Sequence, residues 1–225
     1  MIGNAKFGVY AFYDYDDEPI YVGQTNEQLR VRIRRHLTNQ RTDAVAMRVL
    51  DIFEVAALEM WPLWELDAGR DRLAARSRLN EVEYSAYVRA IRDSRFQAIL
   101  NEKIPAIAPV VELPPSYRFD LSGQAAIDER RHADTRIARR AETISRLAAV
   151  VRERGEVSDG LRRVLVIQAV RLTYLAAARY ADVFGEPHPD PGAIDVGALV
   201  GNLLAEEPDA VSEAEVERLE LEDGE

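Results

Sequence analysis

The first forty residues alternate between apolar runs and polar breaks in a pattern typical of a hairpin followed by a helix. Residues 7–14 and 19–24 are rich in Tyr, Phe, Val and Ile, and the acidic stretch DYDDEP that joins them has the composition of a turn. This pattern predicts a β-hairpin. Asn26 then offers an N-cap for a helix. That helix is predicted from three apolar residues at helical spacing, Leu29, Ile33 and Leu37.

Two more elements complete a first structural unit. The apolar run DIFEVAALEMWPL, residues 51–63, predicts a third strand that ends at Pro62, and a long helical pattern covers residues 72–93. The predicted order is therefore β-β-α-β-α. We expect a compact α/β unit of residues 1–105.

Beyond this unit the pattern becomes rich in proline and then helical. Four prolines between residues 105 and 117 predict an extended linker, which we place at 106–122. The helices predicted after it lie at about 123–154, 158–184, 194–206 and 211–222. We therefore expect an all-α accessory domain over residues 123–206 and an acidic tail over 207–225. Residues 161–180 are too apolar to be exposed on every side, so we expect them in a core or in an oligomer contact.

The composition excludes several classes of protein. At 47% hydrophobic residues the 225-residue chain can bury a substantial core. It has no cysteine, which excludes a disulfide, a thiolate nucleophile and a cysteine-ligated zinc site. No run approaches the ~18 consecutive apolar residues that suggest a membrane span, and we see no secretion signal. We expect a cytoplasmic protein without a membrane partner.

The net charge of −10 is distributed unevenly along the chain. Residues 1–105 carry −1, residues 106–180 carry +4, and residues 181–225 carry −13. The acidity therefore lies in the tail, and the overall charge does not exclude a nucleic-acid partner. The helix predicted at 123–154 has enough arginines for a surface that follows phosphates, although an ordinary solvated face is an equal alternative. These arginines are Arg130, Arg131, Arg136, Arg139, Arg140 and Arg146.

Two similar tripeptides flank the predicted hairpin turn. They are Gly8-Val9-Tyr10 and Tyr21-Val22-Gly23, and the following helix carries Arg32 and His36 four residues apart, on one face. Four more arginines surround this pair and are candidate DNA contacts: Arg30, Arg34, Arg35 and Arg41. Taken alone, the tyrosines are also compatible with ordinary cross-strand packing, and the basic helix with a solvated face.

Taken together, GVY, YVG and LRVRIRRH in this order resemble the GIY-YIG endonuclease superfamily over about residues 6–104. The histidine at position 36 is similar to that of the restriction-enzyme-like branch. The resemblance implies that residues 1–105 form a small mixed β-sheet flanked by helices. It also implies a site built from Tyr10, Tyr21, Arg32, His36, Glu83 and Asn101. Glu81 competes with Glu83 for the glutamate position, and Asn101 is also compatible with a supporting role. Gln24 stands where the family commonly has lysine, and the interval from Glu83 to Asn101 is longer than usual.

The implied chemistry is hydrolysis of a phosphodiester. Mg²⁺, with Mn²⁺ as a substitute, needs only one protein carboxylate beside water and phosphate, and Glu83 fits that requirement. Arg32 would stabilise charge in the transition state. Tyr10 would contact the water with His36 behind it as the proton acceptor, and Tyr21 would hold the phosphate.

The sequence therefore predicts a metal-dependent DNA endonuclease, of a restriction or phage-defence type. The alternative is an inactive member of the fold that binds nucleic acid or protein through its helical domain. We expect the C-terminal helices to contact a second copy of the chain or a protein partner.

Overall fold

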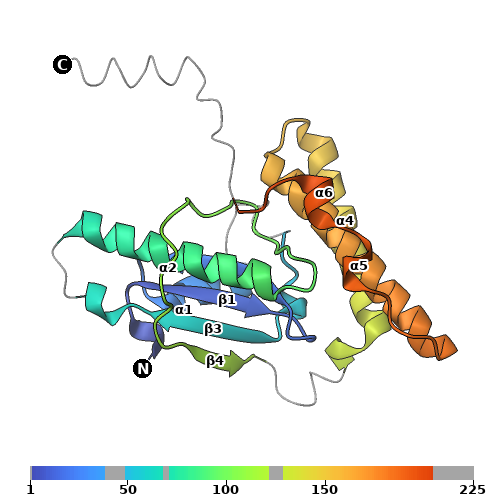
Figure 1. Cartoon of the computed structure of the whole chain (residues 1–225), viewed down its shortest axis with the longest axis horizontal. Helices are drawn as coiled ribbons and strands as arrows, with labels where there is room; N and C mark the ends of the chain where they lie inside the picture. Colours follow the sequence, from blue (N-terminus) through green and yellow to red (C-terminus); the bar gives the residue numbers. More distant parts are fainter. Residues whose placement is uncertain (1, 39–48, 68–70, 122–128, 205–225) are drawn as a thin grey trace.

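The computed structural model describes residues 2–38, 49–67, 71–121 and 129–204 (Figure 1). Its N-terminal half is an antiparallel sheet. The predicted hairpin forms from β1 (Gly8–Tyr13) and β2 (Pro19–Thr25), and β3 (Ala57–Pro62) and β4 (Tyr117–Asp120) extend the sheet in the order β2-β1-β3-β4. The predicted α/β class is confirmed. The described strands all pair antiparallel, whereas the prediction was a mixed sheet.

The register of the hairpin explains both glycines of the tripeptides. Tyr10 lies opposite Gly23, and a Cβ atom on Gly23 would approach the Tyr10 hydroxyl to 2.7 Å. A Cβ atom on Gly8 would lie 2.8 Å from the Leu29 side chain and 2.9 Å from the Trp61 carbonyl oxygen. Both distances are below van der Waals contact, so glycine is required where the Tyr10 ring crosses β2 and where the following helix packs on β1.

Two helices cover opposite faces of the sheet. Helix α1 (Leu29–Leu37) begins at the N-cap Gln28, so the predicted cap Asn26 is wrong by two residues. It packs on the face that carries Tyr10. Helix α2 (Arg72–Asp93) matches its predicted bounds, and the Asp71 side chain caps it by accepting hydrogen bonds from two backbone N–H groups. It packs on the other face of the sheet and runs across β1 and β2 (Figure 1).

Short 3-10 helices flank these elements: η1 (Ile2–Asn4), η2 (Ile52–Glu54), η3 (Trp64–Leu66) and η4 (Pro191–Ala193). The first part of the strand predicted at 51–63 is therefore η2, where the Asp51 carboxylate accepts a hydrogen bond from the backbone N–H of Phe53. The strand itself starts only at Ala57.

The C-terminal half is a helical hairpin. Helix α4 (Ala133–Arg154) is followed by α5 (Asp159–Phe184), which is capped by Ser158 and ends at Gly185 in the left-handed conformation, as predicted. Helix α6 (Val196–Val200) is shorter than the helix predicted at 194–206. The beginning of the helix predicted at 123–154, the helix predicted at 211–222 and the acidic tail 207–225 lie outside the described residues.

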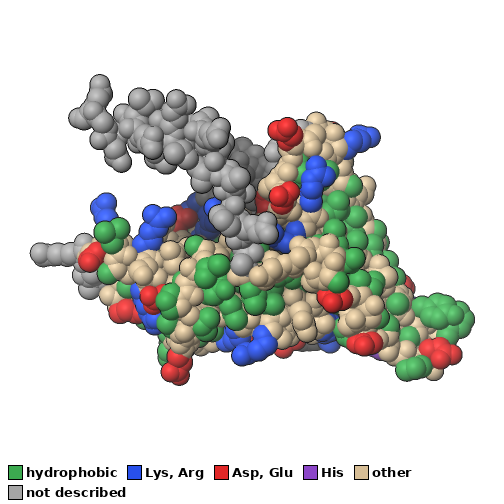
Figure 2. Space-filling model, turned by 45° about the horizontal axis from the view of Figure 1, so that its top comes forward, with side chains coloured by type: hydrophobic (Ala, Val, Ile, Leu, Met, Phe, Trp, Pro, Cys, Tyr) green, Lys and Arg blue, Asp and Glu red, His purple; other side chains and the backbone are tan. Residues whose placement is uncertain are grey.

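Helix α5 contributes to the core, as its apolar composition predicts. It is long and apolar enough to cross a membrane by length and composition alone. Here Val164, Ile167 and Val170 are buried in the core. The C-terminal end of α5 instead exposes Tyr180, Val183 and Phe184 as a hydrophobic patch at one end of the molecule (Figure 2).

The region predicted as a linker is part of the N-terminal fold. Its last residues form β4 on the edge of the sheet, and the backbone N–H of Val111 donates to the Ser85 hydroxyl of α2 at 2.8 Å. The hydroxyl groups of Tyr84 and Tyr87, also on α2, donate to the carbonyls of Leu204 and Leu203 at 3.0 and 2.6 Å. The two halves are thus packed together, and their buried apolar residues form one continuous core.

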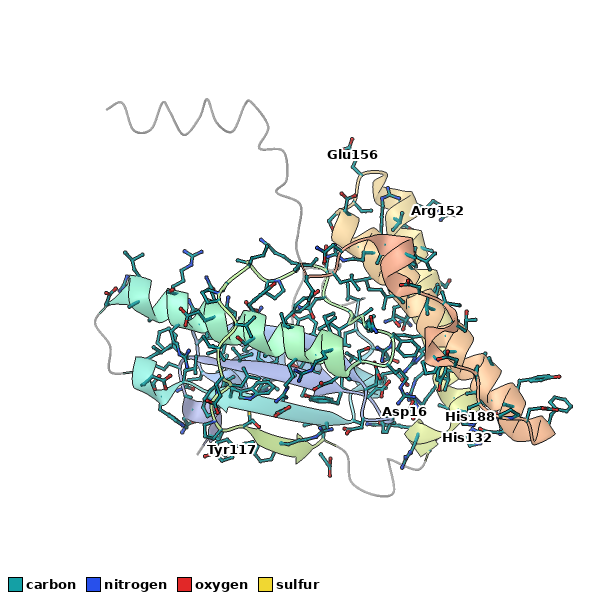
Figure 3. The ribbon with its side chains drawn as sticks, in the orientation of Figure 1. Asp16, Tyr117, His132, Arg152, Glu156 and His188 are labelled. Atoms are coloured by element: carbon teal, nitrogen blue, oxygen red, sulfur yellow. The ribbon has the colours of Figure 1, made fainter. Side chains whose placement is uncertain are left out.

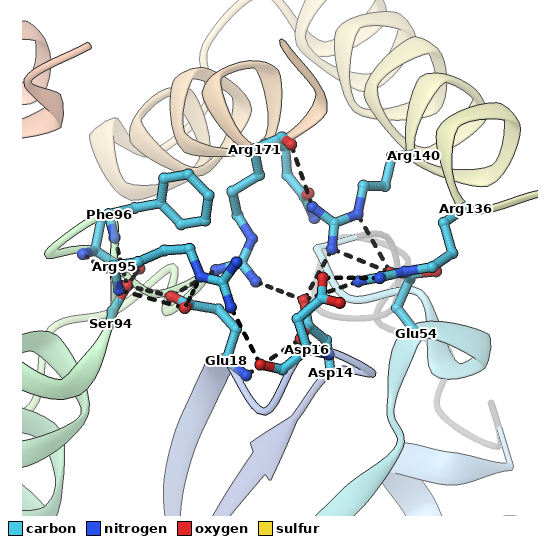
Figure 4. Close-up of polar contacts among 12 residues, drawn as sticks. Asp14, Asp16, Glu18, Glu54, Ser94, Arg95, Phe96, Arg136, Arg140 and Arg171 are labelled. Atoms are coloured by element: carbon cyan, nitrogen blue, oxygen red, sulfur yellow. Dashed lines mark hydrogen bonds and ion pairs between the residues drawn. The ribbon is translucent and has the colours of Figure 1, made fainter. Parts of the chain in front are cut away.

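A buried ion-pair cluster also joins the hairpin turn to the helices (Figure 4). Its members, which are all buried, are Asp14, Glu18, Glu54, Arg136, Arg140 and Arg171. The Asp14 carboxylate accepts hydrogen bonds from Arg136, Arg140 and Arg171 at 3.2, 2.9 and 3.1 Å. Burial raises the pKa of Asp14, but the three guanidinium groups outweigh this effect and hold that pKa below its usual range.

This cluster corrects the predicted phosphate-binding surface on the helix at 123–154. Arg136 and Arg140 are buried against acidic residues of the N-terminal half, and Arg139 is mostly buried beside Glu54 and Asp51. These arginines are already neutralised, so they are not available to DNA. His132 and His188 are exposed on the helical region (Figure 3).

Candidate active site

The centre of the candidate site is a hydrogen bond between the hairpin and α1. The Tyr10 hydroxyl lies 2.8 Å from Nε2 of His36. Tyr10 is fully buried, and its ring centroid is 5.6 Å from that of His36. The predicted pairing of these two residues is therefore present in the structure, with the last turn of α1 placed over the middle of β1.

Tyr21 completes an aromatic group on the same face of the sheet. Its ring centroid lies 6.3 Å from that of Tyr10 and 5.6 Å from that of His36. Phe12, directly opposite Tyr21 in the register, stacks on it at 6.1 Å. Because side chains alternate along a strand, this register is what brings both tyrosines of the tripeptides to one face.

Burial is the largest influence on the pKa of both tyrosines. It raises the pKa of Tyr10 far above the ordinary value; the neighbouring Tyr21 acts in the same direction, and Arg32 opposes them. Burial likewise raises the pKa of Tyr21. Both side chains are therefore neutral phenols at neutral pH, and neither is a preformed phenolate.

Arg32 lies one turn before His36 on α1 and is half-buried. Burial lowers its pKa, but the adjacent Tyr10, Tyr21 and Glu83 raise it by more. Its Nε is buried and has no hydrogen-bond partner among the described residues. A buried guanidinium N–H without a partner is costly, so this group is suited to an anionic ligand.

Glu83 reaches the site from α2. Burial raises its pKa from 4.5 to about 7, although the backbone N–H of Gln24 and the charge of Arg32 oppose that shift. Glu81, the competing residue, instead lies beside Arg78 of its own helix, with 3.4 Å between Oε2 and Nη1. Of the two glutamates, Glu83 is therefore the one that lies with the tyrosines and Arg32.

Asn101 supports the site through the backbone of β2. Its Oδ1 accepts from the backbone N–H of Val22 at 3.0 Å, and its Nδ2 donates to the carbonyl of Val22 at 2.8 Å. The backbone N–H of Leu100 also donates to the Ile20 carbonyl at 2.8 Å. Residues 100–101 thus close the open edge of β2 beside Tyr21. The long interval from Glu83 is taken up by the rest of α2 and the turn after it.

The four arginines predicted as DNA contacts have different surroundings. Arg34 is exposed, and Arg30 is exposed with its Nε donating to the Gln28 side chain at 3.0 Å. Arg35 forms an ion pair with Glu27. Arg41 lies outside the described residues.

Two depressions flank this group of residues. One, of about 160 Å³, is lined by Tyr21, His36 and Asn101, with Lys103 at its rim. The other, of about 650 Å³, opens on the side of Arg32, between the end of β2 and the first half of α2. The site therefore lies between two hollows, an arrangement that suits a chain-like substrate passing across it.

The residues of the second hollow escaped the sequence analysis. Arg72 and Arg76 are four apart on α2, and Asn80 follows one turn later. This spacing on a predicted helix was the available signal, because residues four apart share a helix face. The hollow that this face borders is visible only in the tertiary structure.

The donor set fits a metal ion that is held mainly by its substrate. Among the described residues there is no group of three or more His, Cys, Asp or Glu side chains that could hold a metal. The Glu83 carboxylate lies with the tyrosines and Arg32, and that of Glu102 acts on Tyr21 from the smaller depression. Mg²⁺ is commonly bound through one or two carboxylates together with water and substrate phosphate.

Comparison with protein-family models matches residues 6–66 to the GIY-YIG catalytic domain. This range covers the hairpin, α1 and β3. Comparison with curated proteins and with solved structures gave no match.

Proposed function

Since residues 6–66 place this chain in the GIY-YIG superfamily, whose domains are typically nucleases, we propose that it is a metal-dependent DNA endonuclease. The observation that carries this proposal is the Tyr10–His36 hydrogen bond of 2.8 Å, with Arg32 and Glu83 beside it. These groups cover the needs of phosphodiester hydrolysis: proton removal from water, stabilisation of charge on the phosphate, and a carboxylate for a metal ion.

The proton passes through Tyr10 to His36. As the attacking water loses a proton to the Tyr10 oxygen, Tyr10 gives its own proton to Nε2 of His36, and the hydroxide attacks phosphorus. A simultaneous transfer is needed because burial holds the Tyr10 pKa far above neutral. His36 must therefore be in the tautomer with a free Nε2, and it ends the step as an imidazolium.

Arg32 and Tyr21 bind the phosphate that is cut. The unpartnered Nε of Arg32 and its terminal nitrogens are suited to two phosphate oxygens at once. Tyr21, as a neutral phenol, donates its hydroxyl hydrogen to a third oxygen. Contacts of this type, made to charge that grows in the transition state, are worth ~10²–10³ in rate each.

Glu83 is the residue that would hold a divalent ion, and the ion would stabilise the departing 3′ oxygen. Because burial raises its pKa to about 7, Glu83 must lose a proton before it binds metal near neutral pH. GIY-YIG nucleases are generally metal-dependent. We propose Mg²⁺ as the ion, with Mn²⁺ as a substitute.

We further propose a restriction or phage-defence role. Support comes from His36, the residue type that the restriction-like branch uses at this position, whose Nε2 here lies 2.8 Å from the Tyr10 hydroxyl. A plating assay with unmodified and host-modified phage would test this role.

The test of the proposed activity is incubation of the protein with supercoiled plasmid DNA in Mg²⁺, Mn²⁺ or EDTA. We expect nicking or linearisation with either metal and none in EDTA. Arg32→Ala should reduce the rate by ~10²–10³. The matched control Arg30→Ala removes the same charge from the exposed side of α1 and should mainly weaken DNA affinity.

Equal rate losses for Arg32→Ala and Arg30→Ala would contradict the site assignment. DNA binding without cleavage under every metal condition would contradict the nuclease proposal. That result would favour the alternative of a binding module that keeps the fold.

A further inference from the structure

The hollow of about 650 Å³ beside Arg32 has the composition of a nucleotide site. We call it the β2–α2 cleft. Its apolar lining comes from Phe7, Ala75 and Leu79, and its polar lining includes the amides of Gln24 and Asn80. Its cationic side chains are Arg32, Arg72 and Arg76. An aromatic and apolar surface next to guanidinium groups suits a base joined to a phosphate.

The side chains that line the cleft carry an excess of positive charge. Of the two carboxylates that line it, Glu27 is paired with Arg35, and Asp71 accepts the backbone N–H groups of Leu73 and Ala74 at the start of α2. Arg72 and Arg76 are exposed, and within the described parts of the chain neither forms an ion pair. An anionic ligand would therefore meet free guanidinium groups here.

Two buried polar atoms of residues that line the cleft lack partners among the described residues. They are the acceptor Oε1 of Gln24 and the donor Nε of Arg32. The Gln24 amide is held in place because its Nε2 donates to Oδ1 of Asn80 at 3.1 Å. Buried polar atoms normally have partners, so a donor and an acceptor without described partners, on two residues that line one cleft, point to a ligand that carries both kinds of group.

We propose that the β2–α2 cleft binds one unstacked nucleotide next to the phosphate that is cut. Its outer phosphate lies against Arg72 and Arg76, and its base lies on Phe7 and Leu79. An amino or imino N–H of the base donates to Oε1 of Gln24. This inference rests on the proposed function, because Arg32 then binds the phosphate shared by the cleft and the reacting centre.

The positions of the three arginines around the cleft allow a nucleotide to bind in this way. Arg32 belongs both to the reacting group and to the cleft wall. Arg76 stands one turn and Arg72 two turns before Asn80 on α2, so they continue the phosphate path away from Arg32. Unstacking one base costs a few kcal/mol in duplex DNA and is least costly at a mismatch or in a single strand. We therefore expect single-stranded or distorted DNA to bind best.

The direct test uses thymidine 3′,5′-bisphosphate as a probe, titrated by calorimetry in EDTA, so that neither metal nor cleavage enters the measurement. We expect binding that weakens about tenfold or more in the double variant Arg72→Ala/Arg76→Ala. The matched control is Arg92→Ala/Arg152→Ala, which removes two exposed arginines outside the cleft. It should leave binding unchanged. The bisphosphate of an abasic deoxyribose should bind wild type about tenfold more weakly than the probe, since base stacking is worth ~1–3 kcal/mol.

A second measurement uses DNA itself. In a Glu83→Gln background, anisotropy with a labelled single strand should give a salt slope smaller by about 1.4, because two phosphate contacts are lost in Arg72→Ala/Arg76→Ala. The control double variant should keep the slope.

The outcomes separate this inference from the proposed function. No binding of the bisphosphate by wild type, or equal losses in the two double variants, would overturn the cleft assignment even if the protein cuts DNA. Absence of plasmid cleavage with normal bisphosphate binding would overturn the proposed activity and support the nucleotide site.

Discussion

Glu83→Gln should make the metal-free protein more stable at alkaline pH, although it removes a residue that we place in the active site. The folded-state pKa of Glu83 is raised from 4.5 to about 7 by burial. A carboxyl group whose pKa is raised on folding imposes no penalty below its unfolded pKa. The penalty grows as pH rises from 4.5 to about 7 and is constant above that.

The magnitude follows from the size of the shift. The rise of the Glu83 pKa from 4.5 to about 7, at about 1.36 kcal/mol per pKa unit, gives a ceiling of about 3 kcal/mol at pH 8. At pH 5 the same linkage gives under about 1 kcal/mol. Glutamine keeps the shape of the side chain and loses the charge. Arg32 loses a nearby opposite charge, so we expect a net gain of about 1–3 kcal/mol at pH 8.

Urea unfolding followed by circular dichroism at pH 5, 6, 7 and 8 in EDTA measures this gain. The control is Glu81→Gln, whose carboxylate lies beside Arg78 on the outer part of α2 and should change stability by less than about 0.5 kcal/mol. Adding Mg²⁺ at pH 8 should stabilise wild type and leave Glu83→Gln unchanged, because a ligand stabilises only the state that binds it. A difference between Glu83→Gln and wild type that does not vary with pH would refute the reasoning.

Three further predictions concern the packing and the proton path. Gly23→Ala places a Cβ atom 2.7 Å from the Tyr10 hydroxyl, so it should cost about 1–3 kcal/mol in urea unfolding and lower kcat; unchanged kcat would mean that the ring position is not critical. Tyr10→Phe and His36→Ala should each slow plasmid cleavage by ~10²–10⁴, and the double variant should be little slower than the poorer single variant; multiplicative losses would rule out a shared proton path. Arg171→Met removes one of the three guanidinium groups around buried Asp14 and should cost about 3–5 kcal/mol. Since the folded-state pKa of Asp14 is lowered, the stability it contributes is present above its ordinary pKa and is lost as pH falls through the folded value, so acid unfolding of Arg171→Met should begin at higher pH than in wild type.

The sequence pattern alone predicted the bounds of those helices whose capping residues lie within a few residues of their ends. The bounds of α2 and α5 agree with the prediction because Asp71, Ser158 and Gly185 satisfy or end the helices from within a few residues. The cap of α1 was missed because Gln28 makes no side-chain capping bond, so nothing at the sequence level distinguishes it from Asn26. The four residues of β4, Tyr-Arg-Phe-Asp, alternate aromatic and charged residues, but the stretch is too short and too close to the prolines to predict a strand alone. They form a strand because β3 offers a free edge.

The candidate site was also predicted only in part from the sequence. The sequence alone determined that Tyr10, Tyr21, Arg32 and His36 could meet, because a hairpin register and an i,i+4 helix pair place them within one short segment. The sequence did not decide between Glu83 and Glu81 as the site glutamate. Both residues belong to one helix, and which of them faces the site depends on how that helix packs on the sheet.

Only the tertiary structure decided which of the remaining arginines are buried in ion pairs and which face water. Arg136 and Arg171 follow Asp14 by 122 and 157 positions, and nothing in an arginine-rich helix tells whether a guanidinium faces water or a buried carboxylate. The β2–α2 cleft is likewise bordered by β2, α1 and α2, elements that are separate in the chain. Helix and strand periodicity records which residues share a face of one element. Which faces meet is determined by packing over the whole chain, and in this protein that packing neutralises one group of arginines and leaves Arg32, Arg72 and Arg76 beside an open cleft.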